Sequence, residues 1–204
     1  KPLLKHLEGE LVEDVQSVLK TFYSIIKTTE SYQRFVLLTG VSKFSKVSIF
    51  SDLNNLTDLT MQSRAATLLG YTQAELEENF GGYIQRLSEA CDMTHDATVN
   101  ELREWYNGYK FEENAKTVYN PVSVMKCFQE RKFQNYWFET GSPSFLIKLL
   151  GSRRYHIPVL ENLQASEKLL SSFDVDQLEI ETLLFQTGYL TLRSVREFAG
   201  NRRF

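Results

Sequence analysis

The chain has 204 residues, of which 42% are hydrophobic and 24% are charged, and its formal net charge is −3. These fractions are typical of an ordinary globular protein, and the small negative charge argues against nucleic-acid binding over the whole surface. No apolar run approaches the roughly 18 residues of a membrane span. Two distant cysteines without a C-x-x-C spacing and three scattered histidines indicate neither a disulfide framework nor a metal site. We therefore expect a cytoplasmic protein with buried thiols and no bound metal.

The first predicted element is a long helix over residues 8–30. Its apolar residues recur at steps of three and four, which places them on one stripe, with the charged residues on the opposite face. Such a helix is typical of a surface helix that packs on a sheet. The stripe consists of Leu11, Val15, Val18, Leu19, Phe22, Ile25 and Ile26.

A run of four apolar residues, FVLL at 35–38, follows and is stopped by Thr39 and Gly40. It predicts a strand that is buried on both faces, as in a parallel sheet covered by helices. Ligands of such sheets bind beyond the carboxyl ends of the strands. Hydroxyl and ammonium groups follow this strand, at Thr39, Ser42, Lys43, Ser45 and Lys46. They suit an anion such as phosphate, and the alternative interpretation is a solvated polar loop.

Residues 63–106 are predicted to form a helical cluster. A short helix from Ser63 is closed by Gly70, and a capping box from Thr72 to Glu75 begins the next helix. Two consecutive glycines, Gly81 and Gly82, cost that helix about 2 kcal/mol against two alanines. We therefore expect a break at this pair, then a second helix that reaches residue 91 and another helix over residues 96–106.

The middle of the chain carries turn and capping signals. Residues 106–109, with the sequence YNGY, predict a turn, and residues 110–120 predict a small hairpin. Asn120 followed by Pro121 predicts a helix N-terminus, with the helix continuing to residue 128. Residues 133–140 are aromatic and predicted to be extended. Ser142 and Pro143 repeat the capping device and begin a helix that stops near Gly151.

The last third of the chain is less regular. We expect a strand at residues 157–160, a helix at 176–186 that ends before Gly188, and an alternating strand at 189–195. A helix, a glycine and then a strand is similar to the close of a winged-helix-like unit.

Five segments, taken together and in this order, resemble the predicted AAA-ATPase-like family of bacterial P-loop proteins, whose members are often fused to a PD-(D/E)xK-type nuclease domain. The segments are LTGVSKFSKVSIFSDLNNLTDLT at 38–60, LGYTQAELEENFGGYI at 69–84, WYNGYKF at 105–111, VYNPVSV at 118–124 and NYWFETGSPSFLIKLL at 135–150. The resemblance covers nearly the whole chain.

The resemblance implies an α+β, helix-dominated fold in three parts. These are the distal part of a P-loop α/β core at residues 1–62, a helical lid at 63–151 and a C-terminal helical or winged-helix-like unit at 152–204. In the family a phosphate-binding loop and an acidic Walker B strand precede a KPLL sequence, and this chain begins with those four residues. No G-x-x-x-x-G-K-[ST] occurs in it.

We therefore expect a fragment that lacks Walker A and Walker B. The resemblance implies ATP and Mg²⁺ as cofactors of the full-length protein, with none bound to the fragment and no hydrolysis by the fragment alone. The implied partners are the missing upstream half of the ATPase and a downstream nuclease domain. Self-association through the exposed sheet edge is a further expectation, and no membrane partner is expected.

The resemblance also gives roles to individual residues. Ser42 and Lys43 occupy the position of a sensor that contacts the γ-phosphate or the attacking water, with a solvated loop as the alternative. Arg64 is placed to reach a γ-phosphate, and Arg103 is a weaker candidate of the same kind. The alternative for both arginines is a solvated or paired surface side chain.

Two further motifs could face the nucleotide base: Tyr106, Asn107, Gly108 and Tyr109, and then Asn120 with Pro121. Their alternative interpretation is turn and capping chemistry with aromatic packing. The arginine pairs at 153–154 and 202–203 either contact nucleic acid or lie on a solvated surface. Two functions of other classes stay open: an interaction module without catalysis, and a nucleic-acid-binding winged-helix-like domain.

Overall fold

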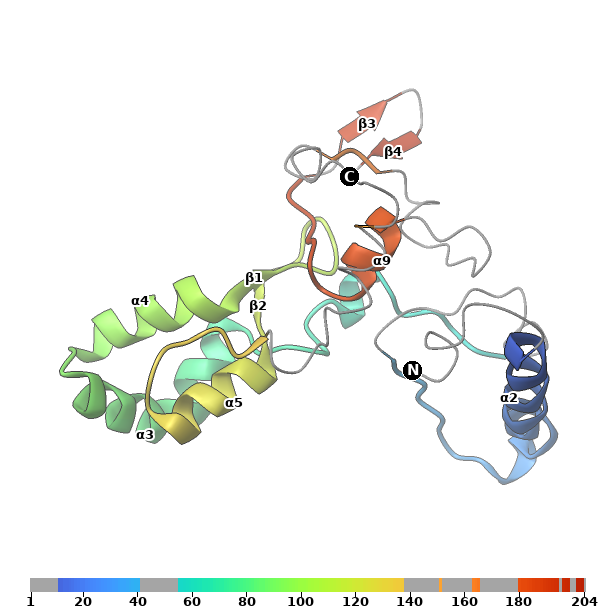
Figure 1. The fold of residues 1–204 in the computed structure, drawn as a ribbon, viewed down its shortest axis with the longest axis horizontal. Coiled ribbons are helices and arrows are strands. Elements are labelled where there is room, and N and C mark those ends of the chain that lie inside the picture. The colour runs from blue at the N-terminus through green and yellow to red at the C-terminus, as the bar shows by residue number, and fades with distance from the viewer. Residues whose placement is uncertain are drawn as a thin grey trace. The chain divides into compact units, whose positions relative to one another are not determined.

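The computed structural model describes residues 11–40, 55–137, 151, 163–165, 180–194, 196–198 and 201–203. The chain divides into two compact units, the first made of residues 1–58 and 164–190 and the second of residues 59–163 and 191–204. The described elements are mostly helices, accompanied by two short antiparallel strand pairs (Figure 1). The predicted α+β, helix-dominated class is confirmed. No helix among the described residues is long and apolar enough to cross a membrane.

The first unit contains the helix α2 (Leu11–Thr28), the 3₁₀ turn η1 (Glu30–Tyr32) and the helix α9 (Ile180–Gln186). The predicted N-terminal helix is thus confirmed over its described part. Its apolar stripe is not packed on a sheet, because Val18, Phe22 and Ile25 are 68%, 63% and 52% exposed. No described strand belongs to this unit, so among the described residues the stripe has no sheet to pack on.

The prediction of a buried strand at residues 35–38 is wrong. Residues 35–40 have no regular secondary structure, and Phe35 and Leu37 are 81% and 51% exposed. A strand forms only where neighbouring strands pair with its backbone groups, and among the described residues none does. The apolar run predicts that this segment is buried, but the described part of the chain contains no strand or core that covers it.

The core of the second unit lies between three helices, α3 (Gln73–Cys91), α4 (His95–Tyr106) and α5 (Pro121–Glu130), which contact one another. Each contributes a stripe at helical spacing that is buried, including Leu76, Ile84 and Leu87 of α3, Leu102 of α4 and Val124 of α5. The apolar burial of these side chains holds the three helices together.

The helix α3 begins where the sequence predicts, but the predicted break at Gly81 and Gly82 is wrong. Thr72 accepts a hydrogen bond from the Glu75 amide while the Glu75 carboxylate accepts one from the Thr72 amide. The helix runs without interruption through Gly81 and Gly82. Packing of its buried stripe outweighs the cost of the two glycines, because tertiary burial supplies most of the stability of a helix.

The next segment is a strand pair, where a turn was predicted at residues 106–109. The strand β1 (Asn107–Tyr109) pairs antiparallel with β2 (Val118–Tyr119), and the register shifts between Asn107 and Tyr109. The turn prediction is wrong for residues 107–109. Gly108, at φ 129°, uses the conformational freedom of glycine at this irregularity rather than in a turn. The hairpin predicted within residues 110–120 is confirmed in part: its second strand lies in that range, but its first strand is 107–109, and residues 110–117 connect the two.

The segment before α3 packs closely against β2. A 3₁₀ turn, η2 (Ser63–Ala65), precedes Gly70, and Tyr71 and Tyr119 exchange backbone hydrogen bonds of 3.3 and 2.7 Å. A Cβ on Gly70 would lie only 2.5 Å from Cγ2 of Val118. Glycine is therefore needed here because the Val118 side chain and the Tyr119 carbonyl oxygen lie too close to its Cα for any Cβ.

The other predicted elements are confirmed in part. The Asn120 side chain accepts a hydrogen bond from the Ser123 amide, and Pro121 begins α5 as predicted. Residues 133–135 have no regular secondary structure, so an extended conformation of this segment stays a prediction. The helix at 180–186 is confirmed, and the predictions for 139–150 and 157–160 lie outside the described residues.

The strand predicted at 189–195 is not found over its described part, residues 189–194. The amides of Tyr189 and Leu190 donate instead to the Leu184 carbonyl, at 2.8 and 3.1 Å, which folds the chain back onto α9. The strands of this region are β3 (Arg196–Phe198) and β4 (Asn201–Arg203), an antiparallel pair.

Candidate functional site

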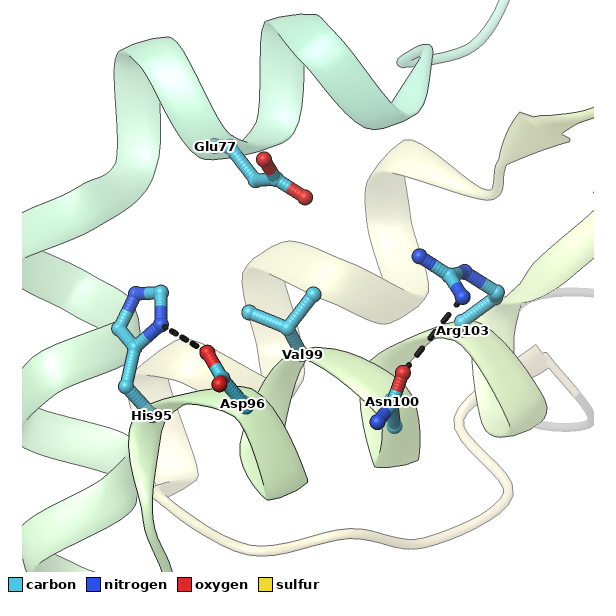
Figure 2. Close-up of a pocket in the computed structure, with 6 residues that line it drawn as sticks. All are labelled: Glu77, His95, Asp96, Val99, Asn100 and Arg103. Carbon is cyan, nitrogen blue, oxygen red and sulfur yellow. Dashed lines mark hydrogen bonds and ion pairs between the residues drawn. The ribbon is translucent and has the colours of Figure 1, made fainter.

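The candidate site is a polar groove on the second unit, between α3 and α4 (Figure 2). It encloses about 330 Å³. One of its residues, Glu77, comes from α3 and faces α4. The others come from α4 at intervals of three and four residues, which places them along one side of that helix. The lining residues are Glu77, His95, Asp96, Val99, Asn100 and Arg103.

A hydrogen-bond network positions Arg103 at one end of the groove. Its Nε donates to Oε1 of Gln73 over 3.2 Å, and its Nη1 makes a longer contact of 3.5 Å with Oδ1 of Asn100. The Tyr119 hydroxyl donates to the same Gln73 oxygen at 2.6 Å, and Gln73 donates in turn to the Glu77 carboxylate. Tyr119 is fully buried, so the network attaches an exposed arginine to the core.

The two partners of Arg103 are neutral amide oxygens. In the described ranges no carboxylate lies within 4.0 Å of its guanidinium group, so its positive charge is not neutralised by an ion pair there. At the other end of the groove, Nδ1 of His95 lies 3.5 Å from Oδ1 of Asp96. The groove thus has Arg103 at one end and the Asp96 carboxylate at the other, while Gln73 joins the Glu77 carboxylate to Arg103. Within the described part of the chain, no three His, Cys, Asp or Glu residues gather as metal ligands.

The surroundings of Tyr119 also shift the pKa of its hydroxyl. Burial raises the pKa of its hydroxyl, while hydrogen bonding to Asn107 and the charge of Arg103 act in the opposite direction. Burial dominates, so the hydroxyl keeps its proton and remains a donor to Gln73. The arrangement therefore holds Gln73 in one orientation, with its oxygen turned to Tyr119 and Arg103.

The structure brings together the two motifs predicted to face a nucleotide base. The Asn120 amide donates to the Tyr106 carbonyl at 2.9 Å, and Asn107 pairs with Tyr119 across β1 and β2. The Tyr106 hydroxyl donates to the Gln134 carbonyl at 2.9 Å and accepts from the Gln134 amide at 3.1 Å. These contacts explain the position of the Tyr106 side chain without a ligand. A contact between this motif and a nucleotide base stays a prediction.

The other members of these motifs have structural surroundings too. The Tyr109 ring meets the Phe111 ring edge-on at 4.6 Å, and burial raises the pKa of Tyr109 to about 12. The Oδ1 atom of Asn107 is buried and accepts no hydrogen bond from the described residues. Gly108 is exposed, and Pro121 occupies the first turn of α5.

Of the three predicted catalytic residues, the structure describes only Arg64. Ser42 and Lys43 lie outside the described residues. Arg64 is exposed on η2, and its Nε donates to Oε1 of Gln62 at 2.8 Å. Neither Arg64 nor its partner lines the groove.

From the sequence, Arg103 is only a weaker candidate, and Gln73, Glu77 and Asn100 are not predicted as site residues. The α4 side of the groove could have been predicted from the sequence, because the polar residues at positions 96, 100 and 103 share one face of a helix. The contact between Gln73 and Tyr119 could not have been predicted, because the two residues are 46 positions apart and meet only in the folded chain.

Comparisons with known proteins agree with the resemblance noted above. Residues 1–50 match the sequence model of a family described as predicted AAA-ATPases. A protein from Azotobacter chroococcum mcd 1, described as an uncharacterized protein in the vnfD 5' region, is 42% identical over 205 residues. The alignment covers all of this chain but 37% of that relative, so the chain spans well under half of the relative's length. No solved structure matches the chain.

Proposed function

Residues 1–50 match the sequence model of the predicted AAA-ATPase family, and from this premise we propose that the chain is part of an ATP-binding module of the AAA type. The observation that carries the proposal is the family match itself. In this proposal residues 1–62 form the distal part of the P-loop core, the helices of residues 63–151 form a lid over the nucleotide, and residues 152–204 form a C-terminal helical or winged-helix-like unit.

The exposed apolar surface of the first unit supports this proposal. Val18, Phe22 and Ile25 lie on one side of α2 and are exposed. Phe35 and Leu37 of the same unit are exposed as well. Isolated exposed apolar side chains are ordinary, but a contiguous set marks a surface that is covered in the functional protein. We propose that the remaining part of the ATPase core covers it, in a longer protein such as the Azotobacter relative.

The proposed cofactors are ATP and Mg²⁺, and both are bound by the longer protein. Phosphoryl transfer needs a cradle of amides and a lysine for the phosphates, together with a held Mg²⁺. The 204 residues contain no G-x-x-x-x-G-K-[ST]. In this proposal the phosphate cradle therefore comes from outside these residues.

The proposed downstream partner is a nuclease domain. The proposed location is cytoplasmic, and two free cysteines, Cys91 and Cys127, agree with it.

The proposed roles of Ser42, Lys43 and Arg64 follow from the same premise. They assist a transition state that other residues hold, as a sensor pair and an arginine that reaches the γ-phosphate. Tyr106, Asn107, Gly108, Tyr109, Asn120 and Pro121 contribute to the base-facing side of the lid.

The test compares the 204-residue chain with a chain that is extended to the full length of the relative. Mg²⁺-dependent phosphate release and ATP binding are measured for both. We expect turnover by the longer chain alone, and Ser42→Ala, Lys43→Ala or Arg64→Ala should lower turnover more than binding. The matched control is Arg86→Ala, since Arg86 stacks on the Tyr83 ring, 4.5 Å from its centre. Turnover by the short chain, or none by the long one, contradicts the proposal.

The hairpin of β3 and β4 favours a second function, nucleic-acid binding. Its register pairs Arg196 with Arg203 and Glu197 with Arg202, so this short hairpin gathers three arginines from two segments of the chain. Basic residues suit the phosphate backbone of a nucleic acid. DNA binding measured by fluorescence anisotropy at several salt concentrations tests this function, which requires an affinity that falls steeply with salt and weakens in Arg196→Ala/Arg203→Ala. Salt-independent binding, or no binding, excludes it.

A further inference from the structure

We propose that the chain associates with a second copy of itself through the outer face of α3. In this pair the α3 helices of the two copies run antiparallel and cross at Gly82, and Glu78 of each copy meets Arg86 of the other. Neither Glu78 nor Arg86 is among the residues proposed to act on a nucleotide, so the self-association stands independently of the ATPase proposal.

The outer face of α3 is the side that is turned away from α4 and α5. Gly82 is two positions before the fully buried Ile84, and at about 100° per residue this places Gly82 on the far side of the helix. Glu78 and Arg86 lie one turn before and one turn after Gly82, so they share its face. All three residues are exposed. In the part of the chain that the structure describes, this face therefore has no covering element.

The described fold gives no reason for a glycine at position 82. The residue lies inside a continuous helix, where glycine is less favourable than alanine. A Cβ at this position would meet nothing within 4 Å, and Gly82 has no positive φ. The distance between two crossing helices depends on the side chains at their contact, so a glycine at the centre of an exposed face allows the backbone of a second helix to approach closely.

The charges on either side of Gly82 are complementary to those of a second copy. A two-fold axis through Gly82 places Glu78 of one copy opposite Arg86 of the other, because both lie four positions from the centre. The pair is formed twice, once on each side of the axis. Residues 78, 82 and 86 form one ridge at steps of four, and such ridges run side by side when two helices cross at about −50°, the commonest packing class.

Both charged groups are available for this contact. In the described ranges, neither the Glu78 carboxylate nor the Arg86 guanidinium forms an ion pair. The Arg86 guanidinium lies over the Tyr83 ring, 4.5 Å from its centre, which orients the arginine without neutralising it. The ring is itself 45% exposed and adds apolar area beside the crossing point. An oriented arginine matches the two oxygens of a carboxylate and loses less side-chain freedom when it binds.

The other charges of the face limit the strength of the association. The two-fold axis relates Glu75 of one copy to Glu89 of the other. Both lie seven positions from Gly82, about 10 Å along the helix, where helices that cross at about −50° have diverged and salt screens like charges. A contact of one helix pair is also small for a protein interface. We therefore expect a weak dimer that weakens further as the salt concentration rises.

The test measures the monomer–dimer equilibrium of the 204-residue chain by sedimentation velocity over a series of concentrations. We expect a dimer with a Kd below about 1 mM. Glu78→Arg and Arg86→Glu should each raise the Kd tenfold or more, because each brings like charges together on both sides of the axis. Gly82→Gln should raise it as much, since glutamine favours the helix but separates the two backbones. The matched control Phe22→Ser, at an exposed ring of α2, should leave the Kd unchanged.

A mixture of the two charge variants separates the contact from a structural effect. Glu78→Arg leaves two positive charges on the face and Arg86→Glu leaves two negative charges, so an equimolar mixture should form a heterodimer although neither variant associates alone. A misfolded variant would not show this recovery. The proposal is overturned if the unchanged chain stays monomeric up to about 1 mM, if either charge variant dimerises as well as the unchanged chain, or if the mixture does not associate. It is also overturned if Phe22→Ser abolishes the dimer, which would place the contact on α2.

Discussion

The glycine pair in the middle of α3 allows a direct test of how packing overrides local propensity. Gly81→Ala and Gly82→Ala each add a methyl group to a continuous helix. A Cβ at either position meets nothing within 4 Å, and neither glycine has a positive φ. The substitutions therefore gain helix propensity without steric cost. Alanine is favoured over glycine by about 1 kcal/mol at a helix interior, partly through the lower entropy of the unfolded chain.

The expected gain is about 1 kcal/mol for each change and about 2 kcal/mol for the double variant, since the two methyl groups share no partner. Urea unfolding followed by tryptophan fluorescence measures it, because both tryptophans, Trp105 and Trp137, belong to this unit. With a slope near 2 kcal/mol per molar urea, the midpoint should rise by about 1 M in the double variant.

Gly70→Ala is the matched control, because the same substitution should have the opposite effect there. Its methyl group would lie 2.5 Å from Val118 Cγ2 and 2.9 Å from the Tyr119 carbonyl oxygen. The backbone of β2 must shift, and overpacking of this kind costs about 1–3 kcal/mol. An unchanged or lower urea midpoint for Gly81→Ala/Gly82→Ala would refute the reasoning, since it would show that the pair needs a conformation that alanine avoids.

Three further predictions concern the caps and the thiols. Asn120→Ala should lower stability by about 1 kcal/mol in the same urea assay, while Asn120→Asp should keep most of it. Hydrogen bonds from Thr72 lower the pKa of Glu75 from 4.5. The ionised carboxylate therefore stabilises the folded chain above about pH 4.5, and this stabilisation is lost as the pH falls through the lower pKa of the folded state. In Glu75→Gln the free energy of unfolding should depend less on pH over this range. Burial raises the pKa of Cys127 to about 11, so Ellman's reagent at pH 8 should modify it only after unfolding, and rapid reaction in a Cys91→Ser variant would contradict this.

The sequence by itself determined the local signals that begin and end helices. Thr72 with Glu75, and Asn120 with Pro121, mark helix N-termini because the amides they satisfy lie within three residues of them. The helical class of the second unit followed from these signals and from apolar residues at helical spacing. Such features need no distant partner, so they can be predicted from a short stretch of chain.

Tertiary structure alone decided the features that depend on distant partners. The helix α3 passes through Gly81 and Gly82 because its stripe is buried against α4 and α5. The apolar run at 35–38 stays exposed because a strand needs neighbours, which the described residues do not provide. The groove exists because folding brings Gln73 to Arg103, 30 residues later, and to Tyr119, 46 residues later. A charge left uncompensated by such contacts has no signature in the order of residues, since it depends on which side chains the fold places beside it.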